Sequence, residues 1–367
     1  MAEYDFRIIR PVEITDAILT SSNVPETVAA TYAGGTTYAE GDRAGLAPVN
    51  GQAQLIYESL SAGNVGNPLP VPPATSTAFW RYVASVYPAY SGAVTYAAGD
   101  IVSSIAADTH LLYESLVAGN VGNALADETK WLHAGALNVT TGEPYNSTNR
   151  WKMFDQSYSS QTECAEEIVV VLAPGTVVNT LAFLNVSAKS IRVQQSVSGY
   201  DQTVQLRSNP SSGWYDWFYG GNWREEDEAL FIDVPPYPAS TLTITISAPG
   251  GTAKCGVCVI GKEKRIGSTQ WGMSKEIVDY SRIIINDFGD VELRRGNFSE
   301  RLNVDVHLDP GSESEVFRAL KAYRAEPLVV VGSTEFTMSI MYCYIYSWRV
   351  PCELTGGFMP IELRGLT

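Results

Sequence analysis

The chain has 367 residues, with 25 Lys and Arg against 40 Asp and Glu, and a formal net charge of −15. This acidity argues against nucleic-acid binding, which depends on basic side chains that replace counterions. No run of about 18 apolar residues occurs, so membrane insertion is not expected. The first residues lack the basic start and apolar centre of a signal peptide, so we expect synthesis in the cytoplasm.

Composition predicts a mainly β protein with several domains. Short runs of Val, Ile, Thr and Tyr alternate with turn residues, and the chain contains 31 Gly and 19 Pro. Its 5 cysteines are an odd number spread over a long chain, which does not indicate a disulfide framework. Cys255 and Cys258 have the spacing of half a zinc knuckle, but strand positions three apart point to opposite faces. We therefore expect buried thiols, no metal and no cofactor.

Residues 1–30 are predicted to form an N-terminal arm or docking segment. They begin with the apolar stretch Phe6–Ile9 and continue through Ile14–Thr20 before Pro25. We expect this arm to take part in assembly with other chains.

Residues 31–135 contain the same module twice. Each copy contains two similar segments followed by a tryptophan. In the first copy these are Tyr32–Asp42, Tyr57–Asn67 and Trp80, and in the second copy they are Tyr90–Asp100, Tyr113–Asn123 and Trp131. The Gly-Asp pairs predict tight turns between short strands. We define residues 31–85 as module 1 and residues 86–135 as module 2.

The order Tyr-x-x-Gly-Asp-x-Val, Tyr, Gly-Asn-x-Gly-Asn, Trp is clearest from Tyr96 to Trp131. It resembles the small chitin-binding-type carbohydrate-binding modules found beside chitinases and cellulases, in which exposed aromatic rings on a small twisted sheet stack on sugar rings. Module 1 departs from this pattern at Arg43–Gly45, where Val102 has no apolar counterpart. Module 1 is therefore expected to be the weaker or purely structural copy.

The resemblance implies a carbohydrate-binding site in these modules. Pyranose faces present C–H groups to aromatic planes, and their rims need amide or carboxylate partners. The implied site residues are Tyr32, Tyr57, Trp80, Tyr90, Tyr113, Asn120, Asn123 and Trp131. The alternative is that the rings form the core of each module and the Asn-Gly pairs are ordinary turns, so that the modules act as spacers or docking sites.

Residues 136–262 are predicted to form a β-sandwich or jelly-roll-like domain. Its expected strands are 168–172, 181–186, 190–193 and 242–246. The aromatic-rich segment Trp214–Trp223 suggests a hairpin that serves as a second sugar platform, a subunit contact or part of the sandwich core. The acidic run Glu225–Glu228 is expected to be a solvated loop.

Residues 263–367 are predicted to form an α+β domain. Its expected strands are 282–285, 302–308, 328–331, 336–347 and 358–363. Ser312 and Glu315 form a capping-box pair that begins a helix ending at Tyr323. Asp305, His307 and Asp309 share one face of a strand, where a half-buried strand with a solvated side is favoured over a cation site.

The C-terminal phrases resemble tail-tip and baseplate components of tailed bacteriophages. The resemblance rests on residues 265–272, 277–281, 287–290 and 294–296, together with 149–155 at the start of the sandwich. It implies a virion protein that is made in the host cytoplasm, which accounts for the sugar-module insert and the missing signal peptide.

The leading hypothesis is a non-enzymatic structural protein of a bacteriophage tail tip or baseplate. It would assemble as a symmetric homo-oligomer, contact other phage tail proteins and present its modules to host cell-surface glycans. One alternative is a glycan-degrading enzyme with accessory modules, since acidic residues are plentiful. Another is that the modules serve only as spacers or docking sites for tail fibres.

Overall fold

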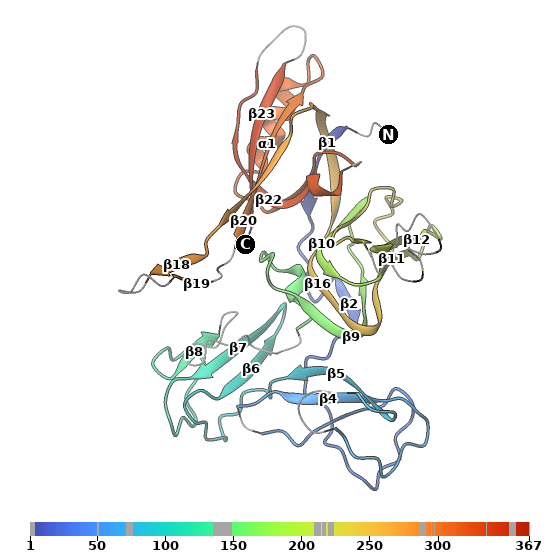
Figure 1. Ribbon diagram of the computed structural model, residues 1–367, viewed down its shortest axis with the longest axis vertical. Coiled ribbons are helices and arrows are strands. Elements are labelled where there is room, and N and C mark those ends of the chain that lie inside the picture. The colour runs from blue at the N-terminus through green and yellow to red at the C-terminus, as the bar shows by residue number, and fades with distance from the viewer. Residues whose placement is uncertain are drawn as a thin grey trace.

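The computed structural model describes residues 4–49, 51–70, 76–134, 149–208, 214, 218, 224–285, 291–294, 296, 298–334, 336–351 and 357–366. The chain is mainly β, as predicted, with one α-helix among these residues. Figure 1 shows a barrel lobe at the top, a sandwich in the middle and the two modules at the bottom. Among the described residues, no helix has the length and apolar character needed to cross a membrane.

Each module is a small three-stranded antiparallel sheet. Module 1 contains β3 (Arg43–Gly45), β4 (Gln54–Ser59) and β5 (Trp80–Val86), paired in the order β3-β4-β5. Module 2 contains β6 (Ile101–Ala106), β7 (Thr109–Ser115) and β8 (Trp131–Ala134), paired in the order β6-β7-β8. The duplication in sequence is therefore a duplication of fold.

The sandwich forms around one large apolar core. Its strands are β2 (Leu19–Ser22), β9 (Thr162–Leu172), β10 (Thr180–Ser187), β11 (Ser190–Gln195), β12 (Asp201–Gln205), β15 (Ala229–Phe231) and the first part of β16 (Leu242–Thr269). A short pair, β13 (Arg207–Ser208) and β14 (Arg224–Glu225), and a 3-10 turn, η1 (Lys152–Phe154), lie beside them. Alternate residues such as Ile168, Val170 and Leu172 point inward and are fully buried, which is the pattern of a strand with one core face.

The barrel lobe is a closed ring of strands. The end of β16 pairs with β1 (Asp5–Pro11), and the ring continues through β21 (Leu328–Val331), β22 (Ile340–Trp348), β23 (Phe358–Gly365) and β20 (Phe298–His307). It closes where β20 returns to β16, with His307 opposite Ser268. Helix α1 (Glu313–Ala322) packs on this lobe through Val316 and Leu320, and the 3-10 turn η3 (Thr337–Ser339) precedes β22.

A β-ribbon extends from the barrel lobe. Its inner part is β17 (Ser274–Asp279), which pairs with β20, and its outer part is β18 (Arg282–Ile285) paired with β19 (Val291–Arg294). In Figure 1 the outer part points away from the rest of the chain.

The prediction of an N-terminal arm is wrong for the apolar stretch Phe6–Ile9. β1 lies between β16 and β21, and Phe6, Ile8 and Ile9 are almost completely buried. A strand with neighbours on both sides satisfies its backbone groups inside the protein and is not free to reach another chain. The start of the chain is therefore a structural part of the barrel.

The expected boundary at residue 262 falls inside a single strand. β16 runs for 28 residues, pairing with β9 and β11 in the sandwich and then with β1 in the barrel. The strands expected at 168–172, 181–186, 190–193, 242–246, 282–285, 302–308, 328–331 and 358–363 overlap strands of the structure, whereas the strand expected at 336–347 begins only at Ile340, after η3. The sequence does not predict β12, β15, β17 or β19, and the structure joins the two regions through β16.

The predicted helix is confirmed, but its capping differs. Ser312 precedes α1, and its hydroxyl donates to the Asp309 carbonyl instead of capping the helix. Glu315 forms an ion pair with Lys264 rather than closing a capping box. Phe317 on this helix is 50% exposed, and its buried residues are Val316 and Leu320.

Candidate functional site

The repeated phrase of each module forms the same hydrogen-bonded loop. The Asn64 amide donates to the Ser59 hydroxyl at 3.1 Å, and the Asn120 amide donates to the Ser115 hydroxyl at 3.0 Å. In both copies the second asparagine of the phrase donates to the side-chain oxygen of the first at 2.8 Å. The Gly-Asn-x-Gly-Asn phrase is therefore a structural loop.

The closing tryptophans are anchored from inside their modules. Trp80 Nε1 donates to the Asn67 carbonyl at 2.9 Å, and Trp131 Nε1 donates to the Asn123 carbonyl at 3.1 Å. Each indole packs edge-on against a buried tyrosine, with ring centroids 5.0 Å apart for Tyr38 and 5.3 Å apart for Tyr96. A tryptophan whose indole N–H donates to a backbone carbonyl and whose ring packs against neighbouring aromatic rings is a core residue.

Several residues of the predicted carbohydrate site are buried, which corrects the prediction that their rings form a stacking surface. Tyr57 and Trp80 are 0% exposed and Trp131 is 1% exposed. Asn120, expected on a sugar rim, is also 1% exposed. A ring with no accessible face cannot stack on a pyranose, so these four residues hold the modules together.

The remaining predicted residues are half-buried. Tyr32 stacks on Tyr38 with centroids 5.7 Å apart, and its counterpart Tyr90 stacks on Tyr96 at 6.1 Å. Tyr113 packs edge-on against His133. The predicted residues that keep part of their surface are thus Tyr32, Tyr90, Tyr113 and Asn123.

The two copies share an apolar core despite the departure seen in module 1. Ala44 is 0% exposed and occupies the position of Val102, so this position does have an apolar counterpart. The neighbouring Arg43 reaches outward, where its guanidinium donates to the Asn23 carbonyl at 3.1 Å. The departure in module 1 therefore provides a contact to the N-terminal segment.

Sequence reasoning missed an exposed apolar pair that both modules retain. Leu60 and Leu116 are 39% and 42% exposed, and Val65 and Val121 are 50% and 49% exposed. They lie on the repeated loop, and the buried asparagines fix its backbone. The signal was present in the alignment of the two copies, where these apolar residues recur between turn residues.

Module 1 is docked on the sandwich by apolar and charged contacts. Val83 and Ala84 of β5 belong to the sandwich core cluster. Arg81 pairs with Glu58 at 2.6 Å within the module and lies 3.7 Å from Glu166 of β9. These contacts fix the module relative to the body of the protein.

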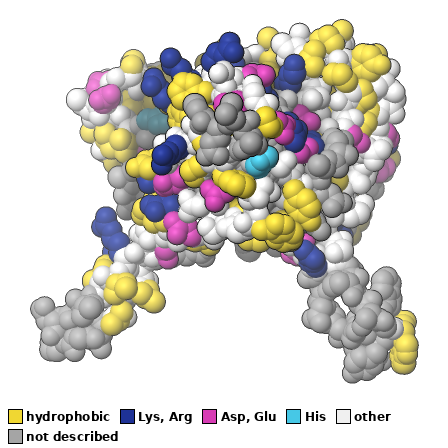
Figure 2. Space-filling view, turned by 90° about the horizontal axis from the view of Figure 1, so that it is seen from above, with side chains coloured by type: hydrophobic (Ala, Val, Ile, Leu, Met, Phe, Trp, Pro, Cys, Tyr) yellow, Lys and Arg dark blue, Asp and Glu magenta, His cyan; other side chains and the backbone are white. Residues whose placement is uncertain are grey.

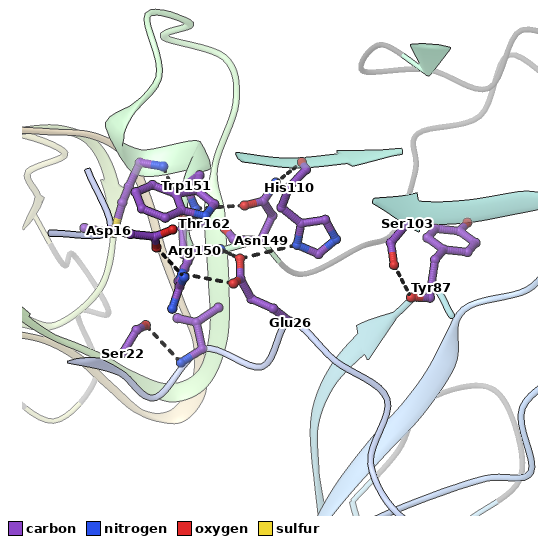
Figure 3. A network of polar contacts seen from close by, with 12 residues as sticks. Asp16, Ser22, Glu26, Tyr87, Ser103, His110, Asn149, Arg150, Trp151 and Thr162 are labelled. Carbon is purple, nitrogen blue, oxygen red and sulfur yellow. Dashed lines mark hydrogen bonds and ion pairs between the residues drawn. The ribbon is translucent and has the colours of Figure 1, made fainter. Parts of the chain in front are cut away.

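Module 2 is held by a polar cluster in which three segments meet (Figure 3). The Glu26 carboxylate lies 2.9 Å from Arg150 Nε and 3.3 Å from His110 Nδ1. Arg150 also pairs with Asp16 at 3.0 Å, and the Asn149 amide donates to the His110 carbonyl at 3.0 Å. We call Asp16, Glu26, His110, Asn149 and Arg150 the Glu26 clamp. It joins the N-terminal segment, β7 of module 2 and the entry to the sandwich.

A hollow with a volume of about 1290 Å³ lies beside β16. Val257, Val259 and Tyr342 contribute apolar walls. Two of its carboxylates are held in ion pairs, Glu326 with Arg10 at 2.9 Å and Glu263 with Arg7 at 3.0 Å. Glu13, Asp108 and Asp155 also line this hollow, and burial raises the pKa of Asp155.

The acidic run is only partly a solvated loop, contrary to expectation. Glu225 is exposed, but the Glu228 side chain is 9% exposed, and burial raises its pKa to about 8. Lys275 lies 4.0 Å from Glu228 and 2.9 Å from Glu300, which places this charged cluster where the sandwich meets the ribbon. Glu228 is not among the residues that line the hollow beside β16.

The candidate metal ligands are accounted for by packing. Cys255 and Cys258 are buried, and burial raises the pKa of both thiols, which disfavours the thiolate that a metal needs. Val304, Val306 and Leu308 are buried while Asp305 and Asp309 are exposed, as expected for a strand with a solvated side. No group of three or more potential ligands that could hold a metal occurs among the residues that the structure describes.

The predicted aromatic hairpin 214–223 lies outside the described residues except at two positions. Trp214 and Phe218 are 74% and 71% exposed, with ring centroids 6.5 Å apart.

Comparison with known proteins found no match to a family model and no match among curated proteins. The functional argument therefore rests on the chain itself.

Proposed function

We propose that this chain is a non-enzymatic structural protein of a bacteriophage tail tip or baseplate, a scaffold that assembles into a symmetric homo-oligomer and holds two modules at fixed positions. Contacts with other phage tail proteins belong to the same proposal. The phage assignment rests on the sequence resemblance, and the scaffold role rests on the architecture.

The observation that carries the scaffold role is the continuity of the body. β16 belongs to both the sandwich and the barrel, so these lobes cannot rotate about a flexible linker. Module 1 shares the sandwich core through Val83 and Ala84, and module 2 is held by the Glu26 clamp. A rigid body suits a scaffold protein that positions other surfaces, because such a protein loses little conformational entropy when it assembles.

Antibody labelling of tailed particles tests the virion assignment. Antibodies raised against the full chain and coupled to gold are applied to purified particles from a culture that produces this protein. We expect label at the distal end of the tail. Particles that lack both the label and peptides of this chain would contradict the assignment.

Glycan attachment is a second proposed role, favoured by the equivalent half-exposed tyrosines of the two modules. Tyr32 and Tyr90 occupy matching positions, and the Tyr90 hydroxyl donates to the Asn123 carbonyl at 2.6 Å. Weak binding at each site would be multiplied in an oligomer by high effective concentration.

A glycan array with the full chain tests this role. The Tyr32→Ala/Tyr90→Ala double variant is expected to lose binding, whereas Val197→Ala, a change at an exposed sandwich residue, is expected to retain it. Absence of binding by the folded wild-type chain would leave the modules as spacers or docking sites for tail fibres.

A further inference from the structure

We propose that the contact between Glu228 and Lys275 is a pH-sensitive latch that holds the root of the β-ribbon against the sandwich. Glu228 lies directly before β15 in the sandwich, whereas Lys275 lies on β17 in the ribbon. The latch is closed in acid and weakens as the pH rises. This inference goes beyond the scaffold role and does not depend on it.

The root of the ribbon is the point at which β20 loses one of its two neighbours. β20 pairs with β23 from Arg301 to His307, and its pairing with β17 extends further, to Phe298. Among the described strands, the ribbon is therefore two-stranded beyond Arg301, and Figure 1 and Figure 2 both show its outer part projecting from the body. A two-stranded ribbon is marginally stable alone, so its root depends on contacts with the body.

The contact at the root is a largely buried cluster of charges. Lys275 Nζ lies 2.9 Å from the carboxylate of Glu300 on β20 and 4.0 Å from that of Glu228. The side chains of Lys275, Glu300 and Glu228 are 12%, 20% and 9% exposed, respectively. Oε2 of Glu228 is buried and has no hydrogen-bond partner among the residues that the structure describes. One lysine thus faces two carboxyl groups, and Glu300 is the closer of the two.

The other groups around Glu228 make its ionisation more difficult. Burial raises the pKa of Glu228 to about 8, and Lys275 opposes this rise. Three further carboxylates add to it, namely Asp227, Glu300 and Glu226. Arg224 pairs with Glu226 at 2.6 Å. Burial and the nearby carboxylates also raise the pKa of Tyr158, on the sandwich side, so this phenol stays neutral. The closed contact therefore holds Glu228 in its neutral form.

Opening of the latch is linked to release of this proton. A carboxyl group that is neutral in the closed contact regains its ordinary pKa of about 4.5 when water reaches it. Between about pH 4.5 and about pH 8 the ratio of open to closed molecules therefore rises by up to about tenfold per pH unit. Above about pH 8 the rise ends, because Glu228 is then ionised in both forms.

Hydrogen exchange of the full chain between pH 5 and pH 8, corrected for the intrinsic rate at each pH, tests the latch. The amides of β17 should exchange faster than those of β9 in the sandwich core, and their protection should fall by up to about tenfold per pH unit. Glu228→Gln, which has nearly the shape of the protonated acid, should keep the protection of β17 constant. The matched control is Glu225→Gln, at an exposed acid of the same run, which should behave like the wild-type chain.

Two results of this experiment would overturn the proposal. One is protection of β17 that is constant with pH in the wild-type chain, or that falls equally in Glu228→Gln. The other is equal protection of β17 and β9 at every pH, because Glu228 would then act only through unfolding of the whole chain.

Glu300→Gln tests the part that the ribbon takes in the cluster. This change removes a carboxylate that faces Glu228 and frees Lys275 to pair with it, so the closed contact tolerates ionised Glu228 better. The fall in β17 protection should therefore shrink but persist. Circular dichroism confirms that each variant folds. A fall as steep as in the wild-type chain would overturn the assignment of the latch to these residues.

Discussion

At the scale of single residues, the aromatic side chains of the modules act as cores. Trp131 is 1% exposed, and its indole is satisfied by the Asn123 carbonyl and by Tyr96. Modules of this size bury little else, so a single tryptophan accounts for much of their stability.

Trp131→Ala is therefore expected to unfold module 2. Removing a buried tryptophan costs about 3–5 kcal/mol, which exceeds what a small module can lose. Hydrogen exchange of the full chain should show loss of protection in β6, β7 and β8 with little change in the sandwich. Leu116→Ala, at a side chain that is 42% exposed, is the control and should keep the module protected. Equal protection in both variants would contradict a core role for Trp131.

Glu228 gives the stability a pH dependence. Burial raises its pKa from 4.5 to about 8, so the folded chain holds a proton that the unfolded chain has already released. The unfolded state then binds fewer protons, and the free energy of unfolding falls as pH rises from about 4.5 to about 8, by up to about 1.4 kcal/mol per pH unit.

Urea denaturation at several pH values checks this prediction. Glu228→Gln, which cannot ionise, should flatten the fall over this range. An exposed acid in the same run, changed as Glu225→Gln, should leave the fall in place. A wild-type chain whose stability is constant from pH 5 to pH 8 would show that Glu228 is not buried as described.

At the scale of elements, β16 decides how the body is built. Gly261 is where β16 changes partners, lying opposite Thr180 of β10 and Pro11 of β1. A Cβ at this position would clash with the Arg10 carbonyl oxygen, because the strands approach too closely for a side chain.

Gly261→Ala is expected to destabilise the full chain by roughly 1–3 kcal/mol, as overpacking does in a closed interior. The control is Gly35→Ala, where an added Cβ meets no atom within 4 Å. Thermal unfolding measures both. Equal midpoints for the two variants would contradict the close packing of β1 on β16.

Local pattern predicted most strands and the helix, but not the partners of each strand. From sequence alone the apolar stretch Phe6–Ile9 is placed in an arm, because its neighbours in the barrel lie more than 250 positions away, with Arg7 opposite Arg265. Alternation reports which face of a strand is buried and not which strand lies beside it. The same limit applies to the modules, where tyrosines and tryptophans suit a minicore and a sugar platform equally well.

At the scale of the whole molecule, the modules and the body form one rigid unit. The Glu26 clamp is a polar link to module 2, and Glu26 lies within 3.3 Å of both Arg150 and His110. The N-terminal segment supplies Asp16 and Glu26, so the start of the chain fastens a module that follows it by many residues.

Glu26→Ala is expected to loosen module 2 without unfolding it. Losing a largely buried charge partner should weaken docking by about 1.5–3 kcal/mol. Limited proteolysis should cut the link between module 2 and the sandwich faster in this variant, with Glu128→Ala, at an exposed site, as control. Identical cleavage rates in the two variants would place the docking energy elsewhere.

The scaffold account requires the full chain to form a closed assembly of identical copies. Native mass spectrometry of the purified protein measures this most directly. The account predicts one dominant species whose mass is a fixed multiple of 39.9 kDa. A chain that remains at the monomer mass across all concentrations would contradict it.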